Sequence, residues 1–166
     1  MKKAYKWITS ILLAILIAIV AVLFVPRIFG LQPMAVLSGS MEPTYHVGSL
    51  VYISKTSPEK INEGDPVTFS IGSDTVVTHR VVKADRDNQC FTTKGDANDN
   101  EDGGTVAYSD VIGKPVFSIP YLGYVAAKAN TRSGMILLVT FIIVVLILTF
   151  LPDLLMKEDK DGNGGK

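Results

Sequence analysis

Ser38 and Ser40 lie in the segment VLSGSMEPTY, where two hydroxyl groups flank a glycine just before a proline turn. Pro43 fixes its own φ and restricts Glu42, so the turn is stiff. Gly39 lacks the Cβ atom that would keep another backbone segment away. A stiff turn that presents a hydroxyl suits a serine nucleophile, but an ordinary polar turn has the same composition. The segment alone leaves both interpretations open.

A serine hydroxyl becomes an effective nucleophile when a base removes its proton, and His79 is the best candidate for that base. In the run TVVTHRVV, strand alternation puts His79 on the same face as Val77 and Val81. An apolar wall favours the neutral imidazole that a general base requires, although a structural histidine would show the same pattern. His46 follows Ser40 by six residues and is expected on a surface loop.

The segment TKGDANDNEDGG, residues 93–104, supplies the carboxylates that could orient such a base, as in a Ser-His-Asp arrangement. A calcium loop is an alternative, because four side chains have its alternate spacing: Asp96, Asn98, Asn100 and Asp102. Such a loop needs glycine where Glu101 stands, so no metal site is expected. A solvated acidic turn remains open.

The composition limits the partners and the cysteine-based sites that can be expected. The formal net charge is zero, which gives no indication of a nucleic-acid partner. Cys90 is the only cysteine, so an internal disulfide is impossible and no CxxC zinc pattern exists.

Two apolar blocks, residues 7–25 and 135–151, are long enough to cross a bilayer and carry no charge. Lysines in residues 1–6 favour a cytoplasmic N-terminus, and a charged tail at 152–166 would share that side. The alternative for the first block is a cleaved signal peptide, but no cleavage site of small residues follows it. Residues 30–131 would then form a domain outside the membrane.

This middle region is rich in Val, Ile, Thr, Phe and Tyr, interrupted by Gly, Pro and Asp. Four strand-like runs are evident: GSLVYIS, DPVTFSIG, DTVVTHRVVKAD and QCFTTKGD. The sequence IGSD, residues 71–74, predicts a tight hairpin between the second and third. The expected fold class is mainly β, a small antiparallel domain flanked by two transmembrane helices.

The ordered set of segments resembles the type I signal peptidases, in the ER-type branch found in eukaryotes, archaea and some Gram-positive bacteria. SGSMEPT is similar to the serine box of that family, GDPVTF and VVTHRVV to its next two segments, and TKGDANDNED to its aspartate box. The resemblance covers about residues 36–123, including VIGKPVFSIPYLG.

The resemblance implies a role for each of five residues. Ser40 would be the nucleophile, and His79 would be the base at a position where the bacterial branch has lysine. Asp102 matches the catalytically important aspartate, and Asp96 matches a second, supporting one that is also the alternative acid. Ser38 stands where the bacterial branch has a candidate oxyanion-hole donor, although it could equally be a turn-stabilising hydroxyl.

The resemblance also implies a function. The chain would be a serine endopeptidase that removes signal peptides from exported preproteins through an acyl-enzyme, without cofactor or metal. Small residues at the cleavage site imply shallow pockets, for which Met41, Val77 and Val81 are candidates. The partners would be preproteins, the bilayer and other peptidase-complex subunits, in a cell membrane or, in a eukaryote, the ER membrane. Two alternatives stay open: a two-span protein displaying a non-enzymatic β binding module, and a serine protease that cleaves its own chain.

Overall fold

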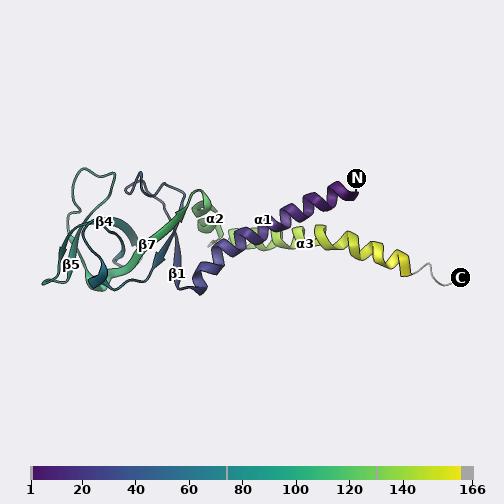
Figure 1. Ribbon diagram of the computed structural model, residues 1–166. Coiled ribbons are helices and arrows are strands. Elements are labelled where there is room, and N and C mark those ends of the chain that lie inside the picture. The colour runs from purple at the N-terminus through teal and green to yellow at the C-terminus, as the bar shows by residue number, and fades with distance from the viewer. Residues whose placement is uncertain (1, 74, 130, 162–166) are drawn as a thin grey trace. The chain divides into compact units, whose positions relative to one another are not determined.

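The computed structural model describes residues 2–73, 75–129 and 131–161, and the chain separates into two compact units. Met1–Phe24 together with Lys128–Lys166 form one, here called the helical unit. Val25–Ala127 form the other, here called the β unit. Figure 1 labels several of their elements.

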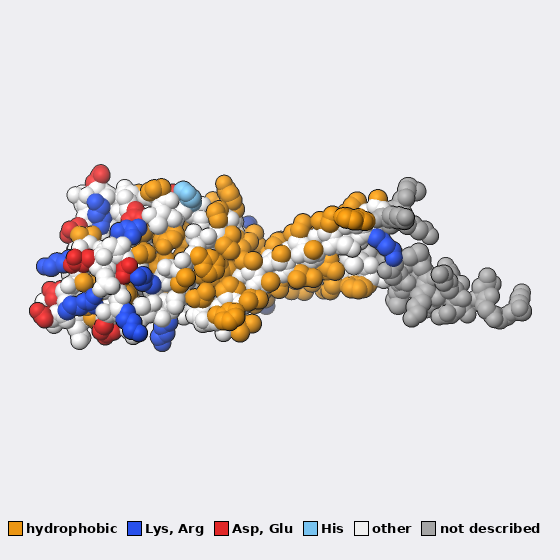
Figure 2. All heavy atoms as spheres, viewed as in Figure 1, with side chains coloured by type: hydrophobic (Ala, Val, Ile, Leu, Met, Phe, Trp, Pro, Cys, Tyr) orange, Lys and Arg blue, Asp and Glu red, His pale blue; other side chains and the backbone are white. Residues whose placement is uncertain are grey.

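The helical unit is built from α1 (Lys2–Ile28) and α3 (Arg132–Asp161). Both are long and apolar enough to cross a membrane: mean hydropathy is 3.2 over Ala4–Ile28 and 2.8 over Arg132–Phe150. Apolar side chains cover the visible faces of both helices (Figure 2). A core helix of a soluble protein would bury such a surface, but these spans are 17% and 6% buried.

One stripe of α1 is more buried than the rest of that helix. Its most buried side chains, Thr9, Leu16 and Leu23, recur every seven residues and therefore share one helix face. Tyr5, near the start of α1, donates a hydrogen bond to the carbonyl of Leu148, near the end of the apolar part of α3 (2.6 Å). The helices thus lie antiparallel.

Both helices are longer than the apolar blocks from which they were predicted. Pro26 was expected to end the first block, but it lies inside the last turns of α1, which ends at Ile28. The second helix was expected to close at Pro152, yet α3 continues to Asp161 through the first part of the predicted tail. Residues 162–166 lie outside the described part of the chain.

The β unit is a seven-stranded antiparallel sheet in the order β1-β2-β7-β3-β4-β5-β6, and it curls around its own core (Figure 1). Its strands are β1 (Leu31–Ala35), β2 (Leu50–Ser54), β3 (Pro66–Ile71), β4 (Thr75–Asp85), β5 (Cys90–Lys94), β6 (Thr105–Ala107) and β7 (Val111–Ile119). The predicted antiparallel β domain between two apolar helices is confirmed. The hairpin predicted at residues 71–74 joins β3 to β4, with Gly72 at a φ of 66°, while residue 74 lies outside the described residues.

One face of the curled sheet holds the main core. Its buried members are Ile61, Val67, Phe69, Val81, Phe91 and Val106. All but Ile61, which follows the Pro58–Lys60 turn, come from strands whose alternate residues point inward, so the period of two in the sequence becomes a packed interior. Val77 packs against this cluster, and His79 is 8% exposed on the same face, as the alternation predicted.

Three short helical pieces interrupt the sheet and were not predicted. They are two 3₁₀ turns, Pro58–Lys60 and Tyr108–Asp110, and the helix α2 (Leu122–Ala129). α2 follows β7 and packs on the loop before β2. The Tyr124 ring lies so close to Gly48 that a Cβ atom there would fall 2.0 Å from it.

Candidate active site

Backbone hydrogen bonds fix the turn that carries Ser40, both where it joins the strands and within the turn itself. At the base, Val36 N donates to Ser49 O and Gly48 N donates to Val36 O, both at 2.9 Å. Within the turn, Tyr45 N donates to Met41 O, also at 2.9 Å. Ser40 therefore sits in a fixed loop between β1 and β2 and is half-buried.

His79 and Asp102 are brought together by the loop between β5 and β6. His79 Nδ1 lies 2.6 Å from Asp102 Oδ2. An ionised carboxylate can only accept, so the proton of this bond sits on Nδ1. The same oxygen accepts a hydrogen bond from Thr93 Oγ1 (2.7 Å), while Asp102 N donates to Thr93 O (2.8 Å).

This reciprocal pair of bonds ties the loop back onto β5. Thr93 pairs with Val81 on β4, two residues from His79. The buried hydroxyl of Thr93 therefore fixes which carboxylate of the acidic segment reaches the imidazole.

Asp96 was the alternative acid for His79, but its carboxylate contacts Arg80 and Thr44 instead. Its carboxylate accepts hydrogen bonds from Arg80 Nε (2.7 Å) and Nη2 (2.6 Å) and from the Thr44 hydroxyl. The bonds from Arg80 hold the pKa of Asp96 below its usual range, against an opposing effect of burial. Asp96 thus links the serine turn to β4, and Asp102 is the acid that contacts His79.

Glycine is required where the acidic loop passes the serine turn. A Cβ atom on Gly95 would lie 2.6 Å from the carbonyl oxygen of Ser40, and that carbonyl accepts a hydrogen bond from Ala97 N (2.9 Å). The close approach expected at Gly39 is absent, since its Cβ would make only an ordinary contact at 3.5 Å. The loop holds the backbone of Ser40 from one side.

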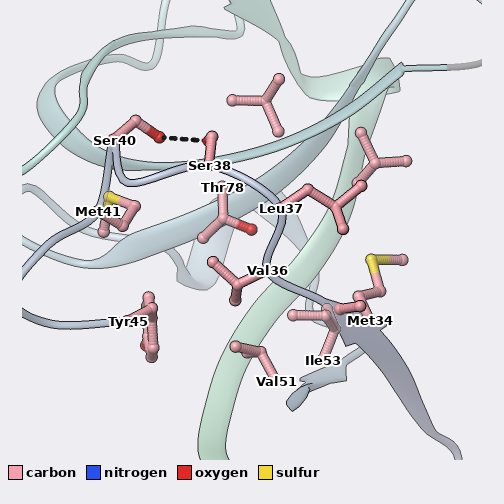
Figure 3. A pocket seen from close by; sticks show the side chains of 13 residues that line it. Met34, Val36, Leu37, Ser38, Ser40, Met41, Tyr45, Val51, Ile53 and Thr78 are labelled. Carbon is pink, nitrogen blue, oxygen red and sulfur yellow. Dashed lines mark hydrogen bonds between the residues drawn. The ribbon is translucent and has the colours of Figure 1, made fainter. Parts of the chain in front are cut away.

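The two serines of the turn face each other, with Ser38 Oγ 3.4 Å from Ser40 Oγ (Figure 3). Among the described residues, no hydrogen bond joins Ser40 Oγ to His79. Ser40 and Thr78 line one cavity, and His79 is the next residue along β4. The structure therefore brings His79 to Asp102 directly and brings Ser40 to the strand that carries His79.

That cavity, here called the serine cavity, has a volume of about 170 Å³. Ser38, Ser40 and Thr78 supply hydroxyl groups to its lining (Figure 3). Its apolar lining comes mainly from Met34, Val36, Met41, Val51, Ile53 and Val77. Met41 and Val77 were expected in such a pocket, but Val81 is 1% exposed in the core and does not line it.

A second cavity of about 480 Å³, here called the histidine cleft, is lined by His79. Its charged or titratable lining is His79, Asp102 and Asp110, and Phe69, Ile71 and Val106 form its apolar wall. Val77 lines both cavities. Ser40 is absent from the described lining of the histidine cleft, and His79 from that of the serine cavity.

The remaining candidates lie apart from this centre. His46 is exposed and pairs with Glu42 on the outside of the serine turn. Asp96 and Asp102 bind Arg80 and His79 rather than each other. Over residues 2–73, 75–129 and 131–161, no group of three His, Cys, Asp or Glu side chains could hold a metal ion.

Sequence reasoning missed Arg80, Thr44 and Thr93, which hold the two aspartates in place. Arg80 directly follows the candidate base in the sequence, and that position next to His79 was a usable signal. The hydroxyls of Thr44 and Thr93 gave no signal, because threonine is common in turns and strands.

Comparison with known proteins matches residues 5–87 to the family described as signal peptidase, peptidase S26. The matched residues include Ser40 and His79 and end before the aspartates. The chain is 35% identical over 120 residues to "Signal peptidase I W" of Bacillus subtilis, covering 64% of this chain and 63% of that protein. It is 36% identical over 108 residues to the human "Signal peptidase complex catalytic subunit SEC11C", covering 58% of this chain.

The chain spans 63% of the length of the Bacillus relative and 56% of the human one. The family match extends over half of the 166 residues, from the first helix through β4. The segments of Ser40 and His79 lie within that match, whereas β5 to β7 and Asp102 lie beyond its end. This chain belongs to the signal peptidase family, peptidase S26.

Proposed function

We propose that the chain is a membrane-bound serine endopeptidase that removes signal peptides from exported preproteins. One observation carries the proposal: Asp102 contacts His79 on β4, and β4 also lines the cavity of Ser40. An imidazole oriented by a carboxylate is the arrangement that activates a serine hydroxyl. The family match and the relatives named as signal peptidases support the choice of substrate.

The bond to Asp102 assigns the two nitrogens of His79 to different tasks. Nδ1 carries the proton that is donated to the carboxylate, which leaves Nε2 with a free lone pair. Nε2 takes the proton of Ser40 Oγ as that oxygen attacks the scissile carbonyl. Asp102 then faces an imidazolium, whose positive charge its carboxylate stabilises.

The resulting tetrahedral intermediate collapses when the peptide C–N bond breaks. The proton held on Nε2 passes to the leaving nitrogen, which becomes the amino group of the mature protein. The signal peptide stays esterified to Ser40 until water, deprotonated by His79, attacks the ester and releases it. No other reactant is needed.

The negative oxygen of the intermediate needs hydrogen-bond donors at the serine turn. Ser38 Oγ is one candidate, since it lies 3.4 Å from Ser40 Oγ, and the backbone N–H of Ser40 is another. A single preorganised donor of this kind contributes about 3 kcal/mol to transition-state stabilisation. We assign Ser38 this role, with the turn-stabilising hydroxyl as the alternative that substitution tests.

The serine cavity suits an extended peptide. β5 pairs with β4 from Arg80 onward, so the edge of Thr75–His79 on that side has no strand partner within the described β unit. A substrate strand can add its backbone to such an edge, and its side chains then alternate in and out. A small, mainly apolar cavity of about 170 Å³ favours small side chains next to the cleaved bond.

The two apolar helices and their antiparallel contact support a membrane arrangement for the chain. We propose that α1 and α3 cross the membrane with both termini on the cytoplasmic side and the β unit outside. Ser40 lies 12 residues beyond the end of α1, so the site stays near the outer face of the bilayer. Anchoring enzyme and signal peptide in one membrane raises their effective concentration.

The membrane is that of the cell or, in a eukaryotic host, the ER. The partners are preproteins and the lipid bilayer, and one relative is named as the catalytic subunit of a complex. We therefore propose further peptidase-complex subunits as partners as well. No nucleic acid and no cofactor takes part.

Processing of a model preprotein in membranes tests the function. Membranes with the wild-type chain should release a mature protein whose N-terminus follows a small residue, and Ser40→Ala should abolish that release while inserting normally. Correct insertion without any cleavage, in native membranes with native preproteins, would favour the non-enzymatic β module instead.

A further inference from the structure

The mechanism proposed for Ser40 does not say which part of a substrate fills the histidine cleft. The cleft holds about 480 Å³, which lies within the range of ligand-binding pockets. His79 and Asp102 form part of its wall, whereas Ser40 lines the serine cavity. Val77 lines both cavities. The nucleophile and the base therefore open onto two different cavities.

The reaction itself divides the substrate in the same way. The carbonyl carbon of the scissile bond must meet Ser40 Oγ, and the leaving nitrogen must meet His79 Nε2 to receive its proton. The chain before the bond then extends along the serine cavity. The chain after the bond starts at His79, beside the histidine cleft.

We propose that the histidine cleft binds the first residues of the mature chain and selects against acidic side chains among them. The proposal rests on the proposed peptidase function and deepens it, because it adds the specificity of the leaving side. The ligand is an extended peptide segment with small, apolar or basic side chains.

The walls of the cleft suit a peptide rather than a compact molecule. Phe69, Ile71 and Val106 give it an apolar side, and Ile71 is 55% exposed at its mouth. Gly72, Gly103 and Gly104 form part of its rim, and a Cβ atom on any of the three would meet nothing within 4 Å. Backbone can therefore pass close to the rim without a clash.

Charge gives the cleft its selectivity. Asp110 lines it with an exposed carboxylate that accepts a hydrogen bond from Ser109 only at one oxygen (3.2 Å). Asp102 adds a second negative charge, and no Lys or Arg is among the described residues of the lining. Like charges repel and opposite charges attract at this range, so an acidic mature residue is disfavoured and a basic one is accepted.

A set of matched preproteins tests the selectivity. They differ only at the second mature residue, which is Ala, Lys or Glu. The wild-type enzyme should cleave the Glu substrate about three- to tenfold more slowly than the Lys substrate at low salt, and added salt should narrow that ratio. Asp110→Asn should bring the ratio closer to one, because Asp102 remains as the other negative charge of the lining.

Asp87→Asn is the matched control, because it removes the same charge from an exposed position in the turn between β4 and β5, outside the cleft. It should leave the ratio at the wild-type value. Equal cleavage of the Lys and Glu substrates by the wild type, or an unchanged ratio in Asp110→Asn, would overturn the proposal while leaving the peptidase intact.

Cross-linking tests occupancy without catalysis. In a Ser40→Ala, Cys90→Ser chain, a cysteine replacing Thr105 in the cleft should form a disulfide with a preprotein cysteine at the second mature residue. A cysteine replacing Val82, which is 40% exposed on β4 outside the cleft, should not. A preprotein cysteine three residues before the cleavage site should not react with position 105.

These outcomes separate the two proposals. A wild-type chain that cleaves no preprotein contradicts the proposed function. Cleavage without the cross-link at position 105, or with a cross-link from the signal-peptide side, contradicts the assignment of the histidine cleft alone.

Discussion

Asp102 and Asp96 lie six residues apart in one loop, yet their carboxylates have separate partners. Asp102 accepts from His79 and Thr93, while Asp96 accepts from Arg80 and Thr44. The first arrangement orients the imidazole of His79, the proposed base. The second fastens the serine turn to the strand that carries the base, which makes Asp96 a positioning residue in our account.

The two aspartates should therefore differ when each is replaced by asparagine. Asp102→Asn should lower kcat by about 10⁴-fold, because the imidazole loses the acceptor that fixes its tautomer. Asp96→Asn should lower kcat far less and should reduce the free energy of unfolding by about 1–3 kcal/mol through lost charged hydrogen bonds. Cleavage kinetics and thermal unfolding of the same purified variants check both expectations. The reverse ranking in kcat would contradict the assignment.

The Arg80–Asp96 pair also gives an acid-stability prediction. The bonds from Arg80 lower the pKa of Asp96 below its ordinary 3.8, so the stabilisation is complete above that pH. It is lost as the pH falls further, through the lowered pKa of the folded state. Thermal unfolding between pH 7 and 2 should show a steeper acid loss in the wild type than in Asp96→Asn. Parallel curves would contradict a stabilising charge on Asp96.

At the level of elements, the loop between β5 and β6 has to pass very close to the serine turn. Gly95→Ala would put a Cβ atom 2.6 Å from the Ser40 carbonyl and force the two segments apart. Overpacking of this kind costs about 1–3 kcal/mol and here displaces the nucleophile. We expect a lower unfolding temperature and at least tenfold slower cleavage.

Gly103→Ala is the control for Gly95→Ala, because a Cβ atom at Gly103 would meet nothing within 4 Å. It should keep the wild-type unfolding temperature. If Gly95→Ala behaved like this control, the close approach would not be what positions Ser40.

The strands that sequence could predict are β2 to β5, which lie in runs rich in Val, Ile, Thr, Phe and Tyr bounded by Gly, Pro and Asp. β7 contains Gly113 and Pro115, which ordinarily argue against a central strand. The sheet accommodates them at irregularities: its register against β2 shifts between Tyr52 and Ile53, and its register against β3 shifts beside Thr68. β1 is interrupted by Pro33, β6 has only three residues, and α2 has only eight.

The candidate site was predictable in its residue types but not in all of its contacts. The alternation of β4 already put His79 on the apolar face, and the core confirms this. Which aspartate reaches His79 depends on the path of the acidic loop, and that path is fixed by Thr93 and by close passage at Gly95. Neither constraint is visible as a pattern in the sequence.

At the scale of the whole molecule, the proposed topology predicts opposite labelling of two parts of the chain. In a Cys90→Ser background, a cysteine replacing Asp87 in the β unit should react with an impermeant maleimide added to intact cells. A cysteine replacing Lys6, before the apolar part of α1, should react only after the membrane is opened. Reaction at both positions in intact cells, or at position 6 alone, would contradict the proposed orientation.

Identification of the acylated residue tests the central claim most directly. A model preprotein is mixed with the full-length enzyme, quenched in acid within milliseconds to seconds, and the digested enzyme is analysed by mass spectrometry. The account predicts that the peptide containing Ser40 gains the mass of the signal-peptide acyl group on Ser40, and that Ser40→Ala abolishes the adduct. An adduct on Ser38, or Ser40-independent cleavage, would contradict it.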